Sequence, residues 1–305
     1  MIEQFHRPST VREALALKKR YQGRAVFLAG GTHLNSRACA LCPEHRLSRG
    51  LDRVERKRAA ANVGPPCSSD CALRPGHFIS LAGLGLDRIE RKQGAVVLGP
   101  LCTLQRLIED RKVPAPLRAA VAQIVSRNIR EVATLGGHVA GNPPCSDLIP
   151  MLVALEARLR LSSPGTTKAM HVAEYVAKPV PGLITRLVVP GPKSGRVAAC
   201  RNARASANSL SIVSAAVSVT LVRGTVERPV IALGGVAGHV VRLTAVEDAL
   251  DGGPLPGLDE LQALVSRAVR PAGDLSGSAA FRRYQAGVTV ALALQGAVGR
   301  KRGRS

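Results

Sequence analysis

The sequence predicts an α+β protein of two domains, on three observations. The chain has 305 residues, and domains commonly contain about 150 residues. The segment Pro190-Gly-Pro-Lys-Ser-Gly195 is rich in residues that interrupt helices and strands. Patterns of short apolar strands and of amphipathic helices occur on both sides of it. We therefore expect domains at residues 1–190 and 195–298 and a basic tail at 299–305, although length alone also allows one large α/β unit.

The first region starts with an amphipathic helix over Thr10–Tyr21, which Ser9 or Thr10 can cap. Short runs of β-branched and large apolar residues then predict strands. In chain order, the region is expected to contain strands at Ala25–Leu28, Phe78–Leu81 and Ala95–Leu98, helices at Leu104–Asp110, Pro116–Val125 and Asp147–Leu155, and strands at Arg158–Leu161 and Ile184–Val189.

The second region begins with a β-branched run over Ser211–Val222, which predicts a long strand. Three segments with helical spacing of apolar residues follow it. They are Ala245–Leu250, Leu258–Val269 and Ala280–Leu294. This region is therefore expected to form an α+β domain of its own.

Part of the first region is duplicated. Gly50-Leu-Asp-Arg-Val-Glu-Arg-Lys57 reappears as Gly85-Leu-Asp-Arg-Ile-Glu-Arg-Lys92, and Gly64-Pro-Pro-Cys67 reappears as Gly99-Pro-Leu-Cys102. The second copy has strand-forming residues where the first has small or polar ones. We therefore expect residues 36–70 to be an inserted, degenerate tandem copy of 71–102 that forms a loop.

Four cysteines of this stretch leave a second interpretation open. Cys39 and Cys42, then Cys67 and Cys71, have a spacing similar to that of a zinc ribbon, and His45 is near. The duplication accounts for most of the spacing without a metal, because Cys39 and Cys71 are equivalent positions. The predicted set of metal ligands is therefore empty, with zinc in the insert as the alternative.

The composition is strongly basic, with a formal net charge of +22. Such a charge suggests nucleic acid or acidic partners. Most of the cations are scattered singly, and aromatic residues for base stacking make up only 2% of the chain, which argues against nucleic acid. No apolar run approaches the ~18 residues of a membrane span, and the start lacks the features of a signal peptide. The expected location is the cytoplasm, without a membrane partner.

Two glycine pairs are the strongest local candidates for a binding site. Gly30-Gly31 follows a predicted strand, and the N–H groups from Ala29 to Leu34 could form an anion-binding nest. Gly136-Gly137, preceded by Thr134, has the same chemistry, and Asp147 lies ten residues beyond it. Neither pair belongs to a Gly-x-Gly-x-x-Gly or P-loop motif. Two anion nests and a carboxylate suit a ligand with a pyrophosphate and a polyol, whereas two tight turns and a helix-capping aspartate are the structural alternative.

These segments resemble the two FAD-binding segments of molybdenum-hydroxylase flavoprotein subunits, the xanthine dehydrogenase and carbon monoxide dehydrogenase family. The resemblance rests on Ala29-Gly-Gly-Thr-His-Leu-Asn35 and on Ala133-Thr-Leu-Gly-Gly-His-Val-Ala140 followed by Ser146-Asp-Leu-Ile-Pro150. It extends to both ends of the chain, through Phe5-His-Arg-Pro-Ser-Thr-Val-Arg-Glu-Ala-Leu15 and Asp274-Leu-Ser-Gly-Ser-Ala-Ala-Phe-Arg-Arg-Tyr-Gln-Ala-Gly287. The opening is most similar to small bacterial FAD subunits associated with purine-type hydroxylases.

The resemblance implies a vanillyl-alcohol-oxidase (PCMH)-type FAD-binding domain over 1–190, followed by a CO-dehydrogenase-flavoprotein-type C-terminal domain. It also implies electron transfer from a [2Fe–2S] subunit, which drains a molybdopterin-binding subunit, through FAD to NAD or another acceptor. No residue of such a subunit acts on the substrate. The residues that the resemblance assigns to FAD are Leu28, Ala29, Gly30, Gly31, Thr32, His33, Leu34, Asn35, Thr134, Gly136, Gly137, His138, Asp147, Ile184 and Arg201.

Several positions depart from the family pattern. His33 stands where Asp, Ser or Gln is common, and His138 where Asn is common. Glu131 stands where Asn is common, and the duplicated stretch directly follows the first FAD segment. Two alternative functions therefore stay open: a docking remnant of such a subunit that binds no cofactor, and a basic nucleic-acid or zinc-binding module built on the insert.

Overall fold

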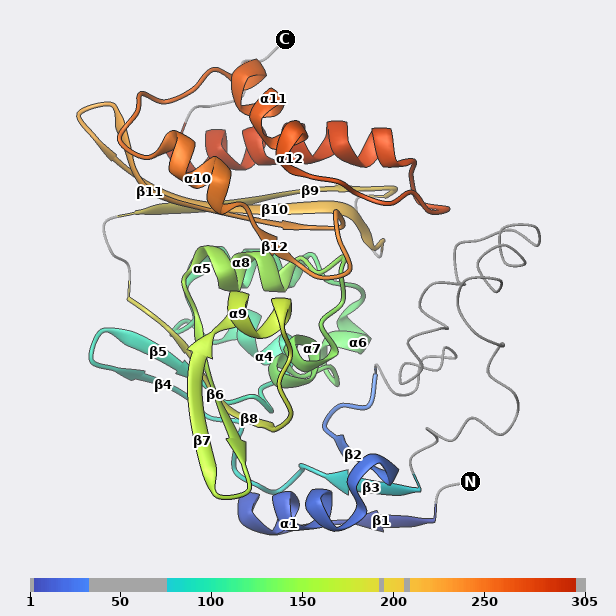
Figure 1. The fold of residues 1–305 in the computed structure, drawn as a ribbon. Helices are drawn as coiled ribbons and strands as arrows, with labels where there is room; N and C mark the ends of the chain where they lie inside the picture. The colour runs from blue at the N-terminus through green and yellow to red at the C-terminus, as the bar shows by residue number, and fades with distance from the viewer. Residues whose placement is uncertain (1–2, 33–75, 192–194, 206–208, 300–305) are drawn as a thin grey trace.

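The computed structural model describes residues 3–32, 76–191, 195–205 and 209–299. Three parts are stacked in Figure 1: a small sheet with one helix, a central part with a larger sheet and several short helices, and a C-terminal sheet covered by three helices. The predicted tandem copy at 36–70 and the tail beyond residue 299 lie outside the described residues.

The small sheet has three parallel strands in the order β1-β3-β2. Its helix α1 begins where Thr10 accepts a hydrogen bond from the Glu13 amide, so Thr10 is the cap. Ala14 and Leu15 are the buried residues of α1. The elements are β1 (Gln4–His6), α1 (Val11–Tyr21), the 3₁₀ helix η1 (Gln22–Arg24), β2 (Ala25–Leu28) and β3 (His77–Ser80).

The central part holds a five-stranded antiparallel sheet in the order β4-β5-β8-β6-β7. Its buried side chains form the main hydrophobic core together with those of the surrounding helices. The strands are β4 (Ile89–Lys92), β5 (Ala95–Leu98), β6 (Arg158–Ser163), β7 (Thr166–His171) and β8 (Leu183–Val189). The helices are α4 (Leu104–Glu109), α5 (Ala115–Ala122), α6 (Arg127–Arg130), α7 (Leu135–Gly141), α8 (Leu148–Ala154) and α9 (Val172–Ala177).

The C-terminal part is a four-stranded antiparallel sheet in the order β12-β11-β10-β9. Alternate residues of β10 point to opposite faces: Ala216 joins the central core, whereas Val217 joins a second core under the helices. Burial of both faces explains why this strand has apolar residues on both of its sides rather than on alternate positions only. The elements are β9 (Arg196–Ala203), β10 (Ser211–Val222), β11 (Thr225–Gly234), β12 (Val241–Arg242), α10 (Thr244–Leu250), α11 (Leu258–Ala268) and α12 (Ala279–Val298).

All helices and strands predicted from the sequence are present, with ends that shift by a few residues. The second copy of the duplicated stretch supplies β3 and β5, as its strand-forming residues predict. The structure adds β1, β4, β7, β9, β11 and β12, and helices α6, α7 and α9. Within the described residues, no helix is both long and apolar enough to cross a membrane.

Candidate functional site

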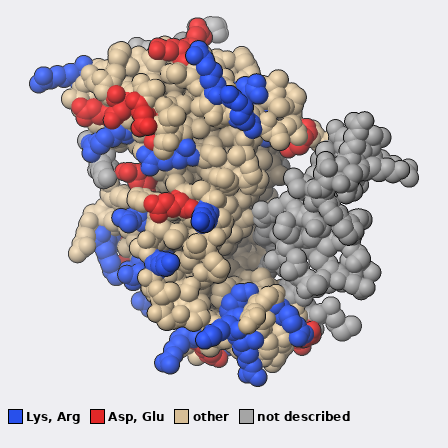
Figure 2. Space-filling model, viewed as in Figure 1, with Lys and Arg blue, Asp and Glu red and all other residues tan. Residues whose placement is uncertain are grey.

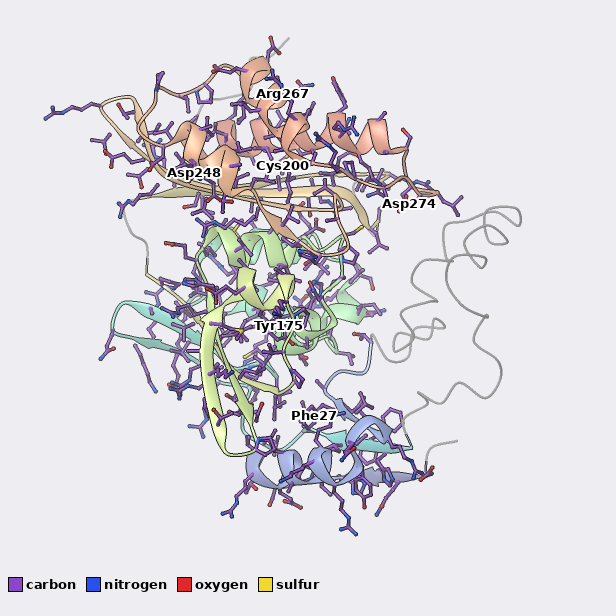
Figure 3. The ribbon with its side chains drawn as sticks, viewed as in Figure 1. Phe27, Tyr175, Cys200, Asp248, Arg267 and Asp274 are labelled. Atoms are coloured by element: carbon purple, nitrogen blue, oxygen red, sulfur yellow. The ribbon has the colours of Figure 1, made fainter. Side chains whose placement is uncertain are left out.

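The first glycine pair lies directly after β2, in the strand-to-loop segment that follows Phe27 (Figure 3). A Cβ atom on Gly30 would lie 1.9 Å from the carbonyl oxygen of Val132, so only glycine permits this contact between two backbones. Gly31 has φ +70°, in the left-handed region that favours glycine. Both glycines therefore have a conformational reason to be there, and they keep side chains out of this loop.

The second glycine pair differs from the sequence expectation of an anion nest, because it forms the first turn of α7. Thr134 caps the helix, since its hydroxyl oxygen accepts from the Gly137 amide at 3.2 Å. The amides of Leu135 and Gly136 donate to the carbonyls of Cys102 and Pro100 at 2.9 and 2.7 Å. The His138 amide donates to Thr134 O. These four amides are thus paired within the protein, and Gly136 is needed because its Cβ would lie 2.5 Å from that of Pro100.

The two glycine segments nevertheless meet in space. Gly30 lies against Val132, two residues before Thr134, and a Cβ on Gly137 would lie 3.9 Å from the Cβ of Ala29. Residues from Leu28 to Thr32 and from Thr134 to His138 are therefore brought to one place. His33, Leu34 and Asn35 lie outside the described residues.

Hydrogen bonds lead from the second segment toward the C-terminal sheet. His138 Nε2 and Ser146 Oγ lie 2.8 Å apart. Ser146 Oγ also accepts from the Ile149 amide at 2.9 Å, so this serine takes the capping place at the start of α8. The Ser146 carbonyl accepts from Ser214 Oγ, on β10, at 2.7 Å. Ser146 lies in the motif that the resemblance includes, but was not assigned a role there. Nothing in the sequence pattern singles out Ser214, because its partner Ser146 is 68 residues away in the chain.

Asp147 does not cap α8 with its side chain. Its Oδ1 accepts from Ser211 Oγ at 2.5 Å, and its Oδ2 lies 3.3 Å from Arg201 Nη1. The Asp147 side chain is only 12% exposed. Burial raises the pKa of the Asp147 carboxyl, while the bond from Ser211 and the charge of Arg201 oppose that rise. The structure thus brings Asp147 and Arg201 together, two residues of the predicted site.

Ile184 lies apart from this group of polar residues. It is buried in the central core, on β8, where it pairs with Leu161 of β6. Its neighbour Leu183 points to the other face of the sheet. Leu183 belongs to a small apolar cluster that packs against Phe27 and Ala29. Leu183 is therefore the β8 residue nearer to the first glycine segment, and alternation along the strand could have indicated this.

The zinc alternative cannot be placed in the structure, because Cys39, Cys42, Cys67 and Cys71 lie outside the described residues. In the parts that the structure does describe, there is no group of three or more His, Cys, Asp or Glu side chains that could hold a metal ion.

The described residues fit an FAD molecule. The contacts of Gly30 with Val132 and of Gly137 with Ala29 bring the two segments together, and Gly30 and Gly31 give the first segment two consecutive residues without side chains, as close approach of a phosphate chain requires. Each carboxylate oxygen of Asp147 accepts one described bond, and an oxygen with two lone pairs can accept another from a ribityl or ribose hydroxyl.

In this architecture, two glycine segments meet between a small sheet and a central part, and a separate C-terminal sheet follows. Such an arrangement is that of an FAD-binding oxidoreductase subunit. Residues 67–192 match the family described as the FAD binding domain in molybdopterin dehydrogenase. Residues 198–297 match the CO dehydrogenase flavoprotein C-terminal domain. The chain belongs to the FAD-binding medium subunits of the molybdenum hydroxylase family, which confirms the resemblance and the predicted fold class.

Three relatives show the extent of the similarity. The chain is 35% identical to the Escherichia coli protein YgfM over 292 residues, which is 95% of each chain. It is 26% identical to the carbon monoxide dehydrogenase medium chain of Afipia carboxidovorans over 308 residues, covering 97% of this chain and 96% of that one. The structure of carbon monoxide dehydrogenase from Hydrogenophaga pseudoflava superposes with a TM-score of 0.80 at 25% identity, over 98% of both chains.

Proposed function

We propose that this chain is the electron-transfer subunit of a molybdopterin-dependent hydroxylase. It would take electrons from a [2Fe–2S] subunit, which receives them from a molybdopterin-binding subunit, and deliver them to NAD or another acceptor. The similarity to the carbon monoxide dehydrogenase medium chain supports such partners, because a medium chain works beside other chains. Residues 1–190 would form the FAD-binding domain and residues 195–298 the C-terminal domain.

One observation carries the proposal: the backbones of the two glycine segments meet, at Gly30 with Val132 and at Gly137 with Ala29. Residues 28–35 would hold the pyrophosphate, with N–H groups of the first segment as donors. The second segment would contribute a side-chain-free surface rather than amides, since the amides of 135–138 are already bonded. Asp147 and Arg201 would hold the sugar region. The further contact from β8 that the resemblance assigns to Ile184 would come from its neighbour Leu183, because Leu183 clusters with Ala29 whereas Ile184 is buried in the central core.

When bound, FAD supplies the redox chemistry, by accepting electrons singly or in pairs. The residues of the chain bind and orient it. The Ser211 hydroxyl and Arg201 keep Asp147 in place as a hydrogen-bond acceptor, and the His138–Ser146 contact ties the second glycine segment to α8.

The substrate of the complex belongs to a partner subunit, so this chain does not determine it. Relatives bear the names glyceraldehyde dehydrogenase medium chain and nicotinate hydroxylase, and their substrates differ in class. We propose a xanthine-dehydrogenase-like, purine-type hydroxylase in the cytoplasm, because the N-terminal segment resembles small bacterial subunits of that kind.

Flavin binding by the purified chain tests the proposal. The protein is expected to take up FAD with the absorption bands of a bound flavin. Gly31→Ala should weaken FAD binding at least tenfold, because a Cβ at φ +70° strains the loop. The matched control is Gly94→Ala, at φ +75° in the β4–β5 turn, where a Cβ meets nothing within 4 Å.

Colourless protein that takes up no added FAD would refute the proposal. Equal loss of FAD in both glycine variants would show that strain alone, and not the loop, is responsible. Co-purification with a molybdopterin subunit and an iron–sulfur subunit, and reduction of the flavin by their substrate, would test the electron-transfer role. The rates at which NAD⁺ and an artificial acceptor reoxidise the reduced flavin would test which acceptor the subunit uses.

A further inference from the structure

Arg282, near the start of α12, is a buried arginine that the proposed site does not use. Figure 2 shows Lys and Arg side chains standing out from the surface of the molecule, whereas Arg282 is only 3% exposed. A buried guanidinium is stable only where its charge and its N–H groups have partners. Its partners therefore show what the side chain holds together.

Arg282 joins three stretches of the C-terminal part. Its Nη2 atom donates to both carboxylate oxygens of Asp274 at 2.6 Å, on the turn that precedes α12 (Figure 3). Its Nη1 atom donates to the carbonyls of Ile212 and Gly235 at 2.8 Å. Ile212 belongs to the beginning of β10, and Gly235 directly follows β11. Arg282 thus ties the adjoining ends of these two strands to the turn.

Three hydrogen bonds run from the same strand ends to residues 144–147. They join Gly235 N to Pro144 O at 2.7 Å, Ser214 Oγ to Ser146 O at 2.7 Å, and Ser211 Oγ to Asp147 Oδ1 at 2.5 Å. Ile212 lies between the two serines, and Gly235 is itself one of the donors. The carbonyls that Arg282 holds therefore belong to the backbone that fixes this segment, and with it the Asp147 carboxylate.

The two strand ends are in close contact at this point. A Cβ atom on Gly235 would lie 2.1 Å from the Ile212 carbonyl oxygen. Without the guanidinium, two neighbouring buried carbonyls would lose a donor, which is unfavourable. Arg282 also lies near residues 144–147 themselves, because burial raises the pKa of the Cys145 thiol and the charge of Arg282 opposes that rise.

We infer that Arg282 is a positioning residue for FAD, because it holds the ends of β10 and β11 and thereby keeps Asp147 in place to accept a hydrogen bond from the sugar region of the cofactor. The inference rests on the proposed function, which assigns Asp147 to that region. A lysine cannot replace this arginine, since its single nitrogen cannot reach the two carbonyls and the Asp274 carboxylate as a planar fork does.

A double-mutant cycle on FAD affinity, measured by flavin fluorescence titration, tests the inference. Asp147→Asn should weaken FAD binding about tenfold, because it removes a charged acceptor. Arg282→Lys should weaken FAD binding by a similar factor, and the double variant should bind no more weakly than Asp147→Asn alone, because the two residues act on one contact. Arg196→Lys is the matched control. Arg196 donates to the Val298 carbonyl at the other end of α12, and its replacement should leave FAD affinity unchanged.

A second variant covers the case in which Arg282→Lys does not fold. Asp274→Asn keeps the arginine but removes the carboxylate that anchors it, and Asp274 is half-exposed, so the same cycle can be measured with this variant. A purely structural role of Arg282 predicts the opposite result, namely that the losses of the single variants multiply in the double variant.

Hydrogen exchange of the flavin-free chain provides a measurement that does not depend on the cofactor. The Gly235 amide, which donates to Pro144 O, should exchange about tenfold faster in Arg282→Lys, whereas the amides of β8 should exchange as in the wild type. The inference is overturned by multiplying losses, by an Asp147→Asn variant that binds FAD like the wild type, or by unchanged exchange at Gly235. A wild-type chain that takes up no FAD would instead refute the proposed function, and the exchange would still show whether Arg282 holds residues 144–147.

Discussion

Asp147 Oδ2 and Arg201 Nη1 lie 3.3 Å apart and join the start of α8 to β9 of the C-terminal sheet. The two side chains are only 12% and 10% exposed. Ser211, on β10, completes the contact through its bond to Asp147 Oδ1. The central part and the C-terminal sheet are therefore held together by a buried charge pair at the predicted cofactor site.

Removing Arg201 should destabilise the chain strongly near pH 7. The variant Arg201→Met leaves the buried Asp147 carboxylate without its counter-charge, which typically costs about 3 kcal/mol or more. Burial already raises the pKa of Asp147, so the folded state favours the protonated carboxyl. The cost is therefore small below the ordinary pKa of an aspartate and grows as pH rises through the raised pKa. Urea unfolding of the variant at about pH 4 and pH 7 measures this difference.

The double variant Asp147→Asn/Arg201→Met should recover part of the lost stability, because the uncompensated charge is gone. Arg127→Met is the control, since it breaks the exposed pair of Arg127 with Glu131 and should cost at most about 1 kcal/mol. Equal losses in Arg201→Met and Arg127→Met would contradict the role given to the buried pair.

The small sheet should lose stability as the solution becomes acidic. His6 Nε2 and His77 Nδ1 lie 3.1 Å apart, and Tyr21 stacks on His77 at 3.7 Å between ring centroids. Burial, followed by the charges of His77 and Arg20, lowers the pKa of His6 below 6.5. His6 therefore binds a proton less well in the folded state than in the unfolded state. Its contribution to the free energy of unfolding is fully present above about pH 6.5 and is lost as the pH falls toward the lowered pKa.

Thermal unfolding at about pH 5.5 and pH 7.5 checks this expectation. His6→Gln should reduce the difference between the two melting temperatures, because an amide can still donate to His77 but does not titrate. His239→Gln, on a turn of the C-terminal part, is the control. An unchanged pH difference in His6→Gln would rule out the histidine pair as its source.

The contact between the two glycine segments should not tolerate a methyl group. Gly30→Ala would place a Cβ 1.9 Å from the Val132 carbonyl oxygen, so the two backbones must separate. We expect a loss of about 1–3 kcal/mol in the free energy of unfolding, together with weaker FAD binding. In Gly23→Ala the added Cβ meets nothing within 4 Å, and stability should hardly change. Fluorescence-monitored unfolding and flavin titration of both variants provide the comparison.

Cys102 should be chemically inert in the folded protein. It is fully buried, its thiol donates to the Asp87 carbonyl at 3.1 Å, and burial raises its pKa to about 11. The thiolate, which is the reactive form, is therefore scarce at about pH 8. Iodoacetamide treatment followed by peptide mass mapping should find Cys102 unmodified without urea and alkylated in urea. Alkylation of the native protein at an unfolded-state rate would contradict the burial of this thiol.

The sequence predicted elements where local pattern and burial agree, such as α1 with its Thr10 cap and the β-branched run of β10. It did not predict β11, because Pro229 argues against an inner strand. The strand tolerates this proline through a bulge, where Arg228 has φ +49° and its amide donates to Asp251. β7 and β9 were missed because most of their residues are small or polar.

The candidate site was predicted only in part, for a similar reason. Gly30 and Gly136 can be recognised in the sequence as members of glycine pairs. The residues that they contact in the fold, Val132 and Pro100, belong to other segments of the chain. The helical turn at α7 could not be inferred, because the carbonyls that accept from its amides belong to Pro100 and Cys102. Likewise, no pattern couples Asp147 with Arg201, which meet only when β9 folds against α8.

The parallel pairing of β2 with β3 has a consequence for how this gene can change. Ala25 lies beside His77 in that pair, so both ends of the connection between the strands are anchored, whatever lies between them. The entropy cost of closing such a connection rises only with the logarithm of its length, by about 0.6 kcal/mol per doubling. A tandem duplication that falls here leaves the register of the sheet intact and can persist in evolution. The same connection begins with the first glycine segment, so the stretch most open to added sequence is also the one that adjoins the proposed flavin site.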